Sequence, residues 1–260
     1  IIVPYPKESD LSMYPIKEHE DKLVYIKEFD FNDDLTDKRS ILHFGAVDNK
    51  ALVYLNDHFI GEHIGGYLAF SFDVTDYISN RNILRVEVSD NTDTFYPFGK
   101  QSNKPSGMWY TSISGIWKTV WMETVPTKEE IRSVKIDTTI DSIDFYVDTD
   151  NEYCISITFD EDTLAYISKS QHLHVDLKNI KYQNWTIKHP VLYTVTIKTN
   201  YDTVQTYVGI REIGVETINN HKYLCLNKEP IYLNGVLDQG YFSDGIYLPK
   251  DDKEYLNDIR

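Results

Sequence analysis

Residues 233–245, which read LNGVLDQGYFSDG, place two carboxylates, two amides and two aromatic rings among three glycines. Carboxylates and amides hydrogen-bond to polar ligands and a ring offers an apolar face, so this mixture is typical of a ligand pocket rather than a packed core. Asp238, Gln239 and Tyr241 are therefore candidate binding residues. The alternative interpretation is a solvated connection in which Gly235 and Gly240 supply turn geometry.

A second polar segment covers residues 98–115, FGKQSNKPSGMWYTSISG, and lies between two strand-like runs. Long loops on a rigid β scaffold often carry binding residues. Lys100, Gln101 and Trp109 are the candidates in this segment, with Tyr110 beside them. Trp109 can equally fill a seam between two domains, and the sequence leaves both roles open.

Two further patterns that could do chemistry are interpreted as structural. Ser114 has no G-x-S-x-G elbow around it, so we expect Gly115 to be structural and Trp117 to lie in a core. His172 and His174 share the outward face of one expected strand, but no third metal ligand is evident. The sequence therefore predicts neither a nucleophilic serine nor a metal site.

The composition favours a globular β protein without a nucleic-acid or membrane partner. Of 260 residues, 41% are hydrophobic and 20 are Tyr, a residue enriched in strands. A formal charge of −15 disfavours phosphate binding, and no apolar run reaches the roughly 18 residues of a membrane span. Cys154 and Cys225 are far apart and are expected to be buried thiols. Residue 1 is Ile rather than Met, which indicates processing or trimming; the location stays open, with the cytoplasm favoured.

Strict alternation of apolar and polar residues recurs along the chain and predicts strands buried on one face. Clear examples are residues 84–88, 153–159, 173–177 and 193–197. Asn56-Asp57 predicts a type I′ hairpin turn, because these residues tolerate a positive φ. Gly65-Gly66 predicts a tight bend, with Tyr67 expected to pack against a neighbouring strand.

The pattern divides the chain into three parts. Pro126 follows a strand-like run and precedes a charged stretch, so residues 1–126 are predicted to form a jelly-roll sandwich and residues 127–212 an immunoglobulin-like sandwich. Residues 213–260 read as a hairpin, a strand, the polar loop and a helix for which Asp251 is the N-cap. These last elements cannot bury their own apolar face, so they are predicted to open a third domain that is absent.

Seven segments in order resemble the front of the family 2 glycoside hydrolases, which include β-galactosidases, β-glucuronidases and β-mannosidases. They read VPYPKESDLS (3–12), LHFGAVDNKALVYLND (42–57), GEHIGGYLAFSFDVTDYI (61–78), SGIWKTVWMETVP (114–126), HPVLYTV (189–195), YVGIRE (207–212) and LNGVLDQGY (233–241). The resemblance implies an all-β pair of domains, a galactose-binding-like jelly roll and an immunoglobulin-like sandwich, followed by the start of a catalytic (β/α)8 barrel. It also implies that the parent protein hydrolyses β-linked glycosides with retention of configuration, which requires two glutamates and no cofactor.

The resemblance assigns roles to the candidate residues of the intact enzyme. Asp238 and Gln239 would lie near sugar hydroxyls and Tyr241 would stack on the sugar, while the segment holding Lys100, Gln101 and Trp109 would reach toward the barrel pocket. In related β-galactosidases an acidic residue lies two positions before this Trp, but Gly107 stands here, which puts galactose preference in doubt.

The resemblance also implies that the chain as given is inactive. The family's acid/base Glu follows an Asn, yet residues 151–152 are the one Asn-Glu pair and have the composition of a turn. Its partners would be the missing barrel and the carbohydrate substrate of the intact enzyme. Whether the chain forms a homo-oligomer stays open. Two other interpretations are a stand-alone carbohydrate-binding module and a β-sandwich adhesion or scaffold protein. Tight binding of sugar to the isolated chain would favour the module over the fragment.

Overall fold

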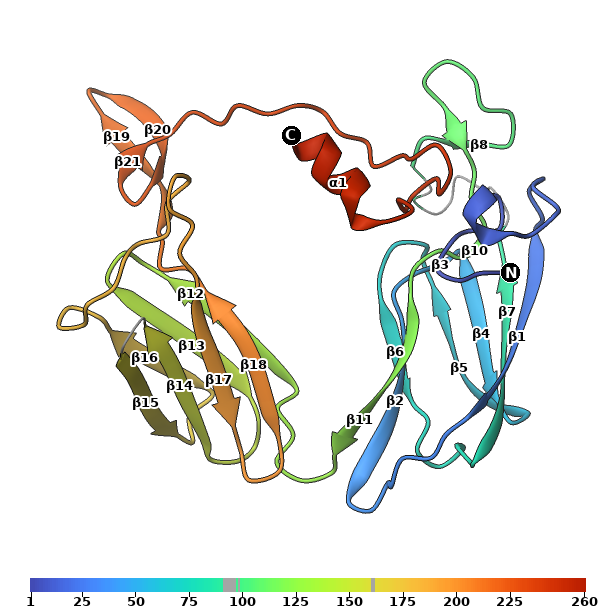
Figure 1. Cartoon of the computed structure of the whole chain (residues 1–260), viewed down its shortest axis with the longest axis horizontal. Helices are drawn as coiled ribbons and strands as arrows, with labels where there is room; N and C mark the ends of the chain where they lie inside the picture. The colour runs from blue at the N-terminus through green and yellow to red at the C-terminus, as the bar shows by residue number, and fades with distance from the viewer. Residues whose placement is uncertain (91–96, 98, 160–161) are drawn as a thin grey trace. The chain divides into compact units, whose positions relative to one another are not determined.

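A computed structural model describes residues 1–90, 97, 99–159 and 162–260, and these fold almost entirely as β structure (Figure 1). Strands account for 47% of the chain and helix for 4%. The all-β fold class is therefore confirmed. The described residues form two compact units, one of residues 1–125 with 237–260 and the other of residues 126–236. The division into three domains and the barrel start stay predictions.

The first unit is a sandwich of two antiparallel sheets. Over the described residues, one sheet has the order β1 (Lys22–Asp30), β7 (Arg81–Ser89), β4 (Lys50–Leu55) and β5 (His58–Ile64). The other has the order β11 (Val120–Pro126), β2 (Lys38–Phe44) and β6 (Phe70–Asp73). Inward residues alternate along each strand as the sequence predicts, and Phe44, Val53 and Leu55 are fully buried between the sheets.

Short strands and a turn of 3-10 helix lie at one end of this sandwich. β3 (Val47–Asp48) pairs with β10 (Gly115–Ile116), and β8 (Gln101–Ser102) runs parallel to β9 (Tyr110–Thr111). The 3-10 turn η1 (Asp10–Ser12) precedes β1 in the chain. These elements position the polar segment that begins near residue 98.

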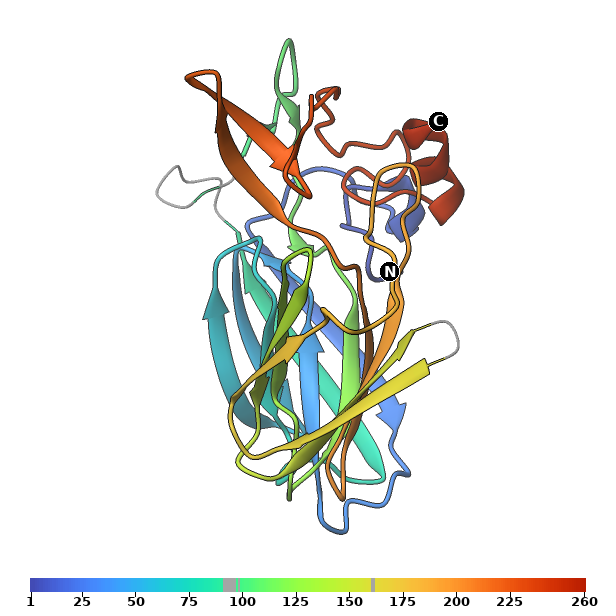
Figure 2. The same ribbon diagram turned by 90° about the vertical axis from the view of Figure 1, so that its left-hand side faces the viewer.

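The second unit, whose strands run from green through yellow to orange in Figure 2, is also a two-sheet sandwich. Over the described residues, one sheet has the order β12 (Ser133–Thr138), β13 (Ser142–Asp148) and β16 (His172–Asp176). The other has the order β15 (Asp162–Ser168), β14 (Tyr153–Phe159), β17 (Tyr193–Lys198) and β18 (Thr203–Val208). The predicted alternation in residues 153–159 is confirmed, because Tyr153, Ile155, Ile157 and Phe159 are all buried. A further small sheet follows, of β19 (Ile213–Ile218), β20 (His221–Leu226) and β21 (Glu229–Pro230).

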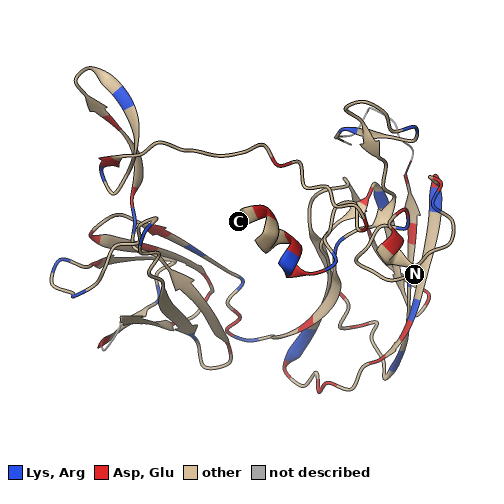
Figure 3. Cartoon of the chain, turned by 45° about the horizontal axis from the view of Figure 1, so that its top comes forward, with Lys and Arg blue, Asp and Glu red and all other residues tan. Residues whose placement is uncertain are grey.

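The C-terminal segment ends in the helix α1 (Asp252–Ile259). Asp251 is its N-cap as predicted, with a carboxylate oxygen 2.9 Å from the Lys253 amide, and acidic residues follow in the first turn (Figure 3). Tyr255, Leu256 and Ile259 are all exposed. Among the described residues, no helix is long and apolar enough to cross a membrane.

Candidate functional site

An open pocket of about 560 Å³ lies in the first unit, where the polar segments of residues 98–115 and 233–245 meet. Both segments were predicted to carry binding residues, although Lys100 of the first and Gln239 of the second are 139 positions apart in the sequence. Aromatic rings, two glycines and two long polar side chains form its walls. The lining residues are Tyr67, Pro97, Gly99, Lys100, Trp117, Gln239, Gly240, Tyr241 and Tyr247.

Two aromatic residues contact the ring of Tyr241, and a third packs against one of them. It stacks on Tyr110 with ring centroids 3.7 Å apart and planes at 11°. Its hydroxyl donates to the Tyr247 hydroxyl at 3.1 Å, and Tyr247 packs edge-on against Trp117 with centroids 5.0 Å apart. Burial raises the pKa of both Tyr241 and Tyr247, so both hydroxyls stay protonated at neutral pH.

The pocket also carries a cation and an amide. The Lys100 ammonium donates to the Gln239 side-chain oxygen at 3.3 Å, which brings together residues that are 139 positions apart. Both side chains are exposed to solvent at the pocket wall. An ammonium offers three hydrogen-bond donors, and an amide offers donors and an acceptor, so this pair suits a ligand rich in hydroxyl or anionic oxygen.

Gln101 lies beneath the pocket as a buried hydrogen-bonding centre. Its side-chain oxygen accepts from the Ile113 amide at 2.7 Å. Its side-chain nitrogen donates to the Tyr67 hydroxyl at 3.2 Å and to the Asp48 carboxylate at 3.4 Å. Gln101 therefore fixes Tyr67 at the pocket wall. Burial raises the pKa of Asp48 to about 6, against the opposing effect of this hydrogen bond.

Local backbone geometry explains why residues 238–248 turn toward the sandwich. The Asp238 carboxylate accepts from the Gly240 amide at 2.8 Å, and Gly240 adopts a φ of +66°. Phe242 and Ile246 then exchange two backbone hydrogen bonds of 2.7 and 3.1 Å, which close a small loop. At its tip, the Asp244 carbonyl accepts from the Ser9 hydroxyl at 2.7 Å, so η1 anchors the loop.

The structure places the six predicted site residues in different ways. Lys100, Gln239 and Tyr241 line the pocket together, and Gln101 supports it from below. Asp238 is exposed and bonded to its own turn, and Trp109 is 44% exposed and does not line the pocket. Their roles in binding stay predictions.

Sequence reasoning did not select Tyr247 or Trp117 for the pocket. Trp117 is buried as expected, and its ring nitrogen donates to the Gly66 carbonyl at 2.7 Å, but it also lines the pocket. Tyr67 lies on the pocket wall and packs edge-on against Trp117, with centroids 6.0 Å apart. The available signal was the repetition of Tyr at positions 241 and 247 on either side of a Gly-containing turn.

The two histidines on the outward face of β16 both bond to one carboxylate. His172 and His174 lie 2.7 and 2.9 Å from the same oxygen of Asp144, and they lower the pKa of that carboxyl. Within the described ranges, no group of three or more His, Cys, Asp or Glu side chains could hold a metal ion.

Comparison with known proteins decides the family. The model of the glycosyl hydrolase 2 galactose-binding domain-like family matches residues 4–138, which is more than half of the chain. The chain belongs to this glycosyl hydrolase 2 family.

Curated relatives of this glycosyl hydrolase 2 chain are longer proteins. It is 27% identical over 246 residues to a β-galactosidase of Thermoanaerobacter pseudethanolicus, covering 82% of this chain and 31% of that protein. It is 24% identical over 227 residues to a β-glucuronidase of Streptococcus agalactiae, covering 76% and 36%. The glycosyl hydrolase 2 chain thus spans about a third of the length of these relatives.

Solved structures share the fold of the glycosyl hydrolase 2 chain. The β-glucuronidase of Bifidobacterium dentium matches with a TM-score of 0.79 at 20% identity, over 100% of this chain and 49% of that one. A β-glucuronidase from an uncultured Clostridium sp. matches with a TM-score of 0.78 at 22% identity, over 100% and 46%. Both matches show that the chain shares the fold of these two proteins.

Proposed function

We propose that these residues form the N-terminal, non-catalytic part of a retaining β-glycoside hydrolase that acts in carbohydrate metabolism. Family membership supports the proposal, as does the share of about a third that the chain covers in a β-galactosidase and a β-glucuronidase. The proposed partner of this part is a C-terminal catalytic barrel. Apolar side chains that a barrel could cover include Tyr232, Val236 and Leu237, each at least 85% exposed.

The meeting of Lys100, Gln239 and Tyr241 in one pocket is the observation that carries the proposed role in sugar binding. Sugars have apolar C–H faces and hydroxyl edges, so an aromatic ring beside an amide and an ammonium suits them. In the intact enzyme, Tyr241 would offer its ring to the sugar while Gln239 and Lys100 hydrogen-bond to its oxygens.

We propose that the 260-residue chain itself hydrolyses no glycoside, because retaining hydrolysis needs two carboxyl groups about 5 Å apart, one as nucleophile and one as acid/base. Glu152 follows Asn151, but it is exposed and forms an ion pair of 3.6 Å with Lys169.

A chimaeric enzyme tests this function. Residues 1–260 would replace the matching portion of the Thermoanaerobacter pseudethanolicus β-galactosidase, and kcat/KM would be measured on p-nitrophenyl β-galactoside and β-glucuronide. We expect activity from the chimaera and none from the isolated chain. Tyr241→Ala in the chimaera should lower kcat/KM by about 2- to 10-fold, the effect of losing an aromatic contact of about 0.5–1.5 kcal/mol. Tyr201→Ala, which removes an exposed ring from the second unit, is the matched control.

The aromatic walls of the pocket also favour a second candidate, a stand-alone carbohydrate-binding module. Titration calorimetry of the isolated chain separates the two candidates. The fragment predicts weak or absent binding of galactose, glucuronate and their oligomers. Tight saturable binding to the isolated chain, lost in Tyr241→Ala, would replace the fragment proposal with the module.

A further inference from the structure

A buried carboxylate lies directly behind the wall of the candidate pocket. Asp48, the last residue of β3, is 3% exposed and packs against Gly66, where an added Cβ would lie 2.4 Å from a carboxylate oxygen. The next residue along the chain, Tyr67, lines the pocket. The Gly66 carbonyl accepts from Trp117, which also lines the pocket. Asp48 therefore contacts the backbone that carries the pocket wall.

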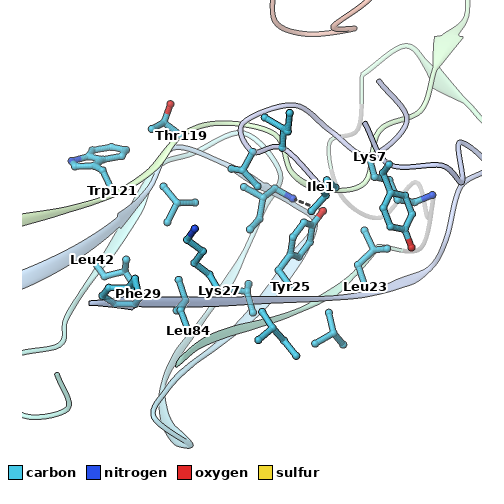
Figure 4. Close-up of a pocket in the computed structure, with 18 of the residues that line it drawn as sticks. Ile1, Lys7, Leu23, Tyr25, Lys27, Phe29, Leu42, Leu84, Thr119 and Trp121 are labelled. Carbon is cyan, nitrogen blue, oxygen red and sulfur yellow. Dashed lines mark hydrogen bonds between the residues drawn. The ribbon is translucent and has the colours of Figure 1, made fainter. Parts of the chain in front are cut away.

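The strand that ends in Asp48 is firmly supported. Asp48 pairs with Gly115 in the ladder between β3 and β10. The next residue of β10, Ile116, donates its backbone amide to the Tyr25 hydroxyl at 3.3 Å, which the dashed line in Figure 4 marks. Tyr25 belongs to β1, which pairs along its whole length with β7. Asp48 thus has the rigid support that a residue needs to position its neighbours.

Gln101 connects this carboxylate to the pocket. Its side-chain nitrogen donates to the Asp48 carboxylate at 3.4 Å and to the Tyr67 hydroxyl oxygen at 3.2 Å. Its side-chain oxygen accepts from the Ile113 amide at 2.7 Å. Burial raises the pKa of Tyr67, and a hydrogen bond from Tyr247 to the same hydroxyl oxygen opposes this effect. Among the described residues, none accepts the hydrogen of the Tyr67 hydroxyl, so this hydrogen is available to a ligand.

The Gln101 amide has two orientations, and the charge of Asp48 favours one of them. A carboxylate accepts hydrogen bonds and donates none, so it favours the orientation in which the amide nitrogen faces Asp48 and Tyr67. A protonated Asp48 carries an O–H that needs an acceptor, and a half-turn of the amide would supply its oxygen. Tyr67 would then donate to that oxygen, and its hydrogen would be lost to the ligand.

The charge of Asp48 is unfavourable for stability, which favours a functional role. Burial raises the pKa of Asp48 to about 6, and the hydrogen bond from Gln101 is the largest effect that opposes burial. Asp48→Asn would keep an acceptor for Gln101 without a buried charge, so the carboxylate has no structural advantage over an amide. Titratable groups with such shifts beside a pocket are typical of functional sites.

Three other titratable groups are coupled to Asp48. The charge of Glu8 raises the pKa of Asp48, and His19 lowers it. Burial and then the charge of Asp48 raise the pKa of Asp90, to about 7. Any test of Asp48 therefore has to separate its titration from that of Asp90.

We propose that Asp48, Gln101 and Tyr67 form a positioning relay, in which the charge of Asp48 holds Gln101 so that the Tyr67 hydroxyl donates to a ligand oxygen in the pocket. The pocket then binds its ligand more tightly at pH 8, where Asp48 is charged, than at pH 5. This relay rests on the proposed role of the pocket in sugar binding, and it adds a regulation of that site by pH.

The first test needs no ligand and uses the 260-residue chain labelled with carbon-13 at Tyr Cζ and Asp Cγ. The Asp48 Cγ resonance should titrate near pH 6, and the Tyr67 Cζ resonance should follow with the same midpoint. The Cγ midpoints distinguish Asp48 from Asp90. Asp48→Asn and Gln101→Met should each remove this step from the Tyr67 titration. Tyr201, an exposed ring of the second unit, is the internal control and should not follow Asp48.

The second test measures the Kd of isopropyl β-thiogalactoside, a ligand that is not hydrolysed, for the chimaeric enzyme between pH 5 and pH 8. Comparison at each pH with Asp48→Asn or Tyr67→Phe cancels titrations of the barrel. The unsubstituted chimaera should bind about 2- to 10-fold more tightly than either variant at pH 8, the effect of one hydrogen bond, and nearly equally at pH 5. The double variant should lose no more affinity than either single one. A thermal melt of each variant checks folding.

Asp34→Asn is the matched control for the charge. Hydrogen bonds from Thr36 lower the pKa of this exposed carboxyl, so it titrates below the tested range, and the variant should keep the wild-type profile.

Either of two results would overturn the relay. One is a Tyr67 resonance that stays constant while Asp48 titrates. The other is an active chimaera in which Asp48→Asn or Tyr67→Phe binds the thiogalactoside at pH 8 as tightly as the unsubstituted protein. An inactive chimaera would instead contradict the proposed function, and the Tyr67 titration in the 260-residue chain would then decide the relay by itself.

Discussion

Tyr241 lies flat against Tyr110, with ring centroids 3.7 Å apart and an angle of 11° between the planes. The two residues are far apart in the chain, and their contact joins the C-terminal segment to β9. The Asp244 carbonyl, which accepts from the Ser9 hydroxyl at 2.7 Å, is the second attachment. The C-terminal segment is thus part of the first unit rather than an independent tail.

We predict that Tyr241→Ala loosens this segment. Loss of a stacked pair worth about 0.5–1.5 kcal/mol should speed amide exchange at Phe242 and Ile246 by about 2- to 10-fold. Tyr241→Phe keeps the stacking and loses only the hydrogen bond to Tyr247, so its effect should be smaller. Tyr232→Ala removes a ring that is 90% exposed and should leave the exchange rates unchanged. Equal exchange in wild type and Tyr241→Ala would show that the stack does not hold the segment.

The strands were predictable because alternation along a strand is a local signal. Residues 153–159 need only their own sequence to predict which side chains enter the core, and Asn56-Asp57 predicts its own turn, with φ angles of 51° and 65°. The pocket was only partly predictable. Loop composition selected Lys100, Gln239 and Tyr241, but the position of Tyr247 between Tyr241 and Trp117 depends on a fold that brings distant segments together.

Gly115 is predicted to tolerate no side chain. Its φ is +78°, and an added Cβ would lie 2.1 Å from the Tyr25 hydroxyl oxygen. Gly115→Ala should therefore lower the free energy of unfolding of the first unit by about 2–5 kcal/mol, from backbone strain and overpacking together. Urea unfolding followed by fluorescence would measure it.

Gly214→Ala is the matched control for this substitution. No atom lies within 4 Å of an added Cβ at Gly214, and its φ is not in the left-handed region. This variant should stay within about 1 kcal/mol of wild type. Adding Tyr25→Phe to Gly115→Ala should recover part of the loss, because the hydroxyl is gone while the strain remains. Equal stability of the two alanine variants would contradict the assigned role of Gly115.

Asp251 is predicted to determine the start of α1. Its carboxylate accepts from the Lys253 amide at 2.9 Å, so Asp251→Ala should cost the helix about 1 kcal/mol. Cα chemical shifts of residues 252–255 should then move toward random-coil values. Asp251→Ser keeps a capping oxygen and should preserve the shifts. Asp258→Ala, at the other end of the helix, removes a negative charge from the C-terminal turn and should not weaken it.

Asp48 is predicted to make the first unit less stable as the pH rises. Burial raises the pKa of its carboxyl from 3.8 to about 6, so between these values the folded state holds the proton more tightly than the unfolded state. The folded state thus binds more protons, and the free energy of unfolding falls with increasing pH across this window and levels off above it. The cost is on the order of 3 kcal/mol between pH 4 and pH 8.

Asp48→Asn isolates this contribution because an amide does not titrate and its oxygen can still accept from Gln101. The free energy of unfolding of the variant minus that of wild type should increase from pH 4 to pH 8, as followed by fluorescence of Trp117 and Trp121 in the first unit. Burial is the chief cause that raises the pKa of Asp90 to about 7, so the free energy of unfolding keeps a residual dependence on pH in both proteins. Asp34→Asn is the control, because hydrogen bonds from Thr36 lower the pKa of Asp34 and place its titration below this window. A constant difference between Asp48→Asn and wild type across this range would mean that the Asp48 carboxylate is not the destabilising charge.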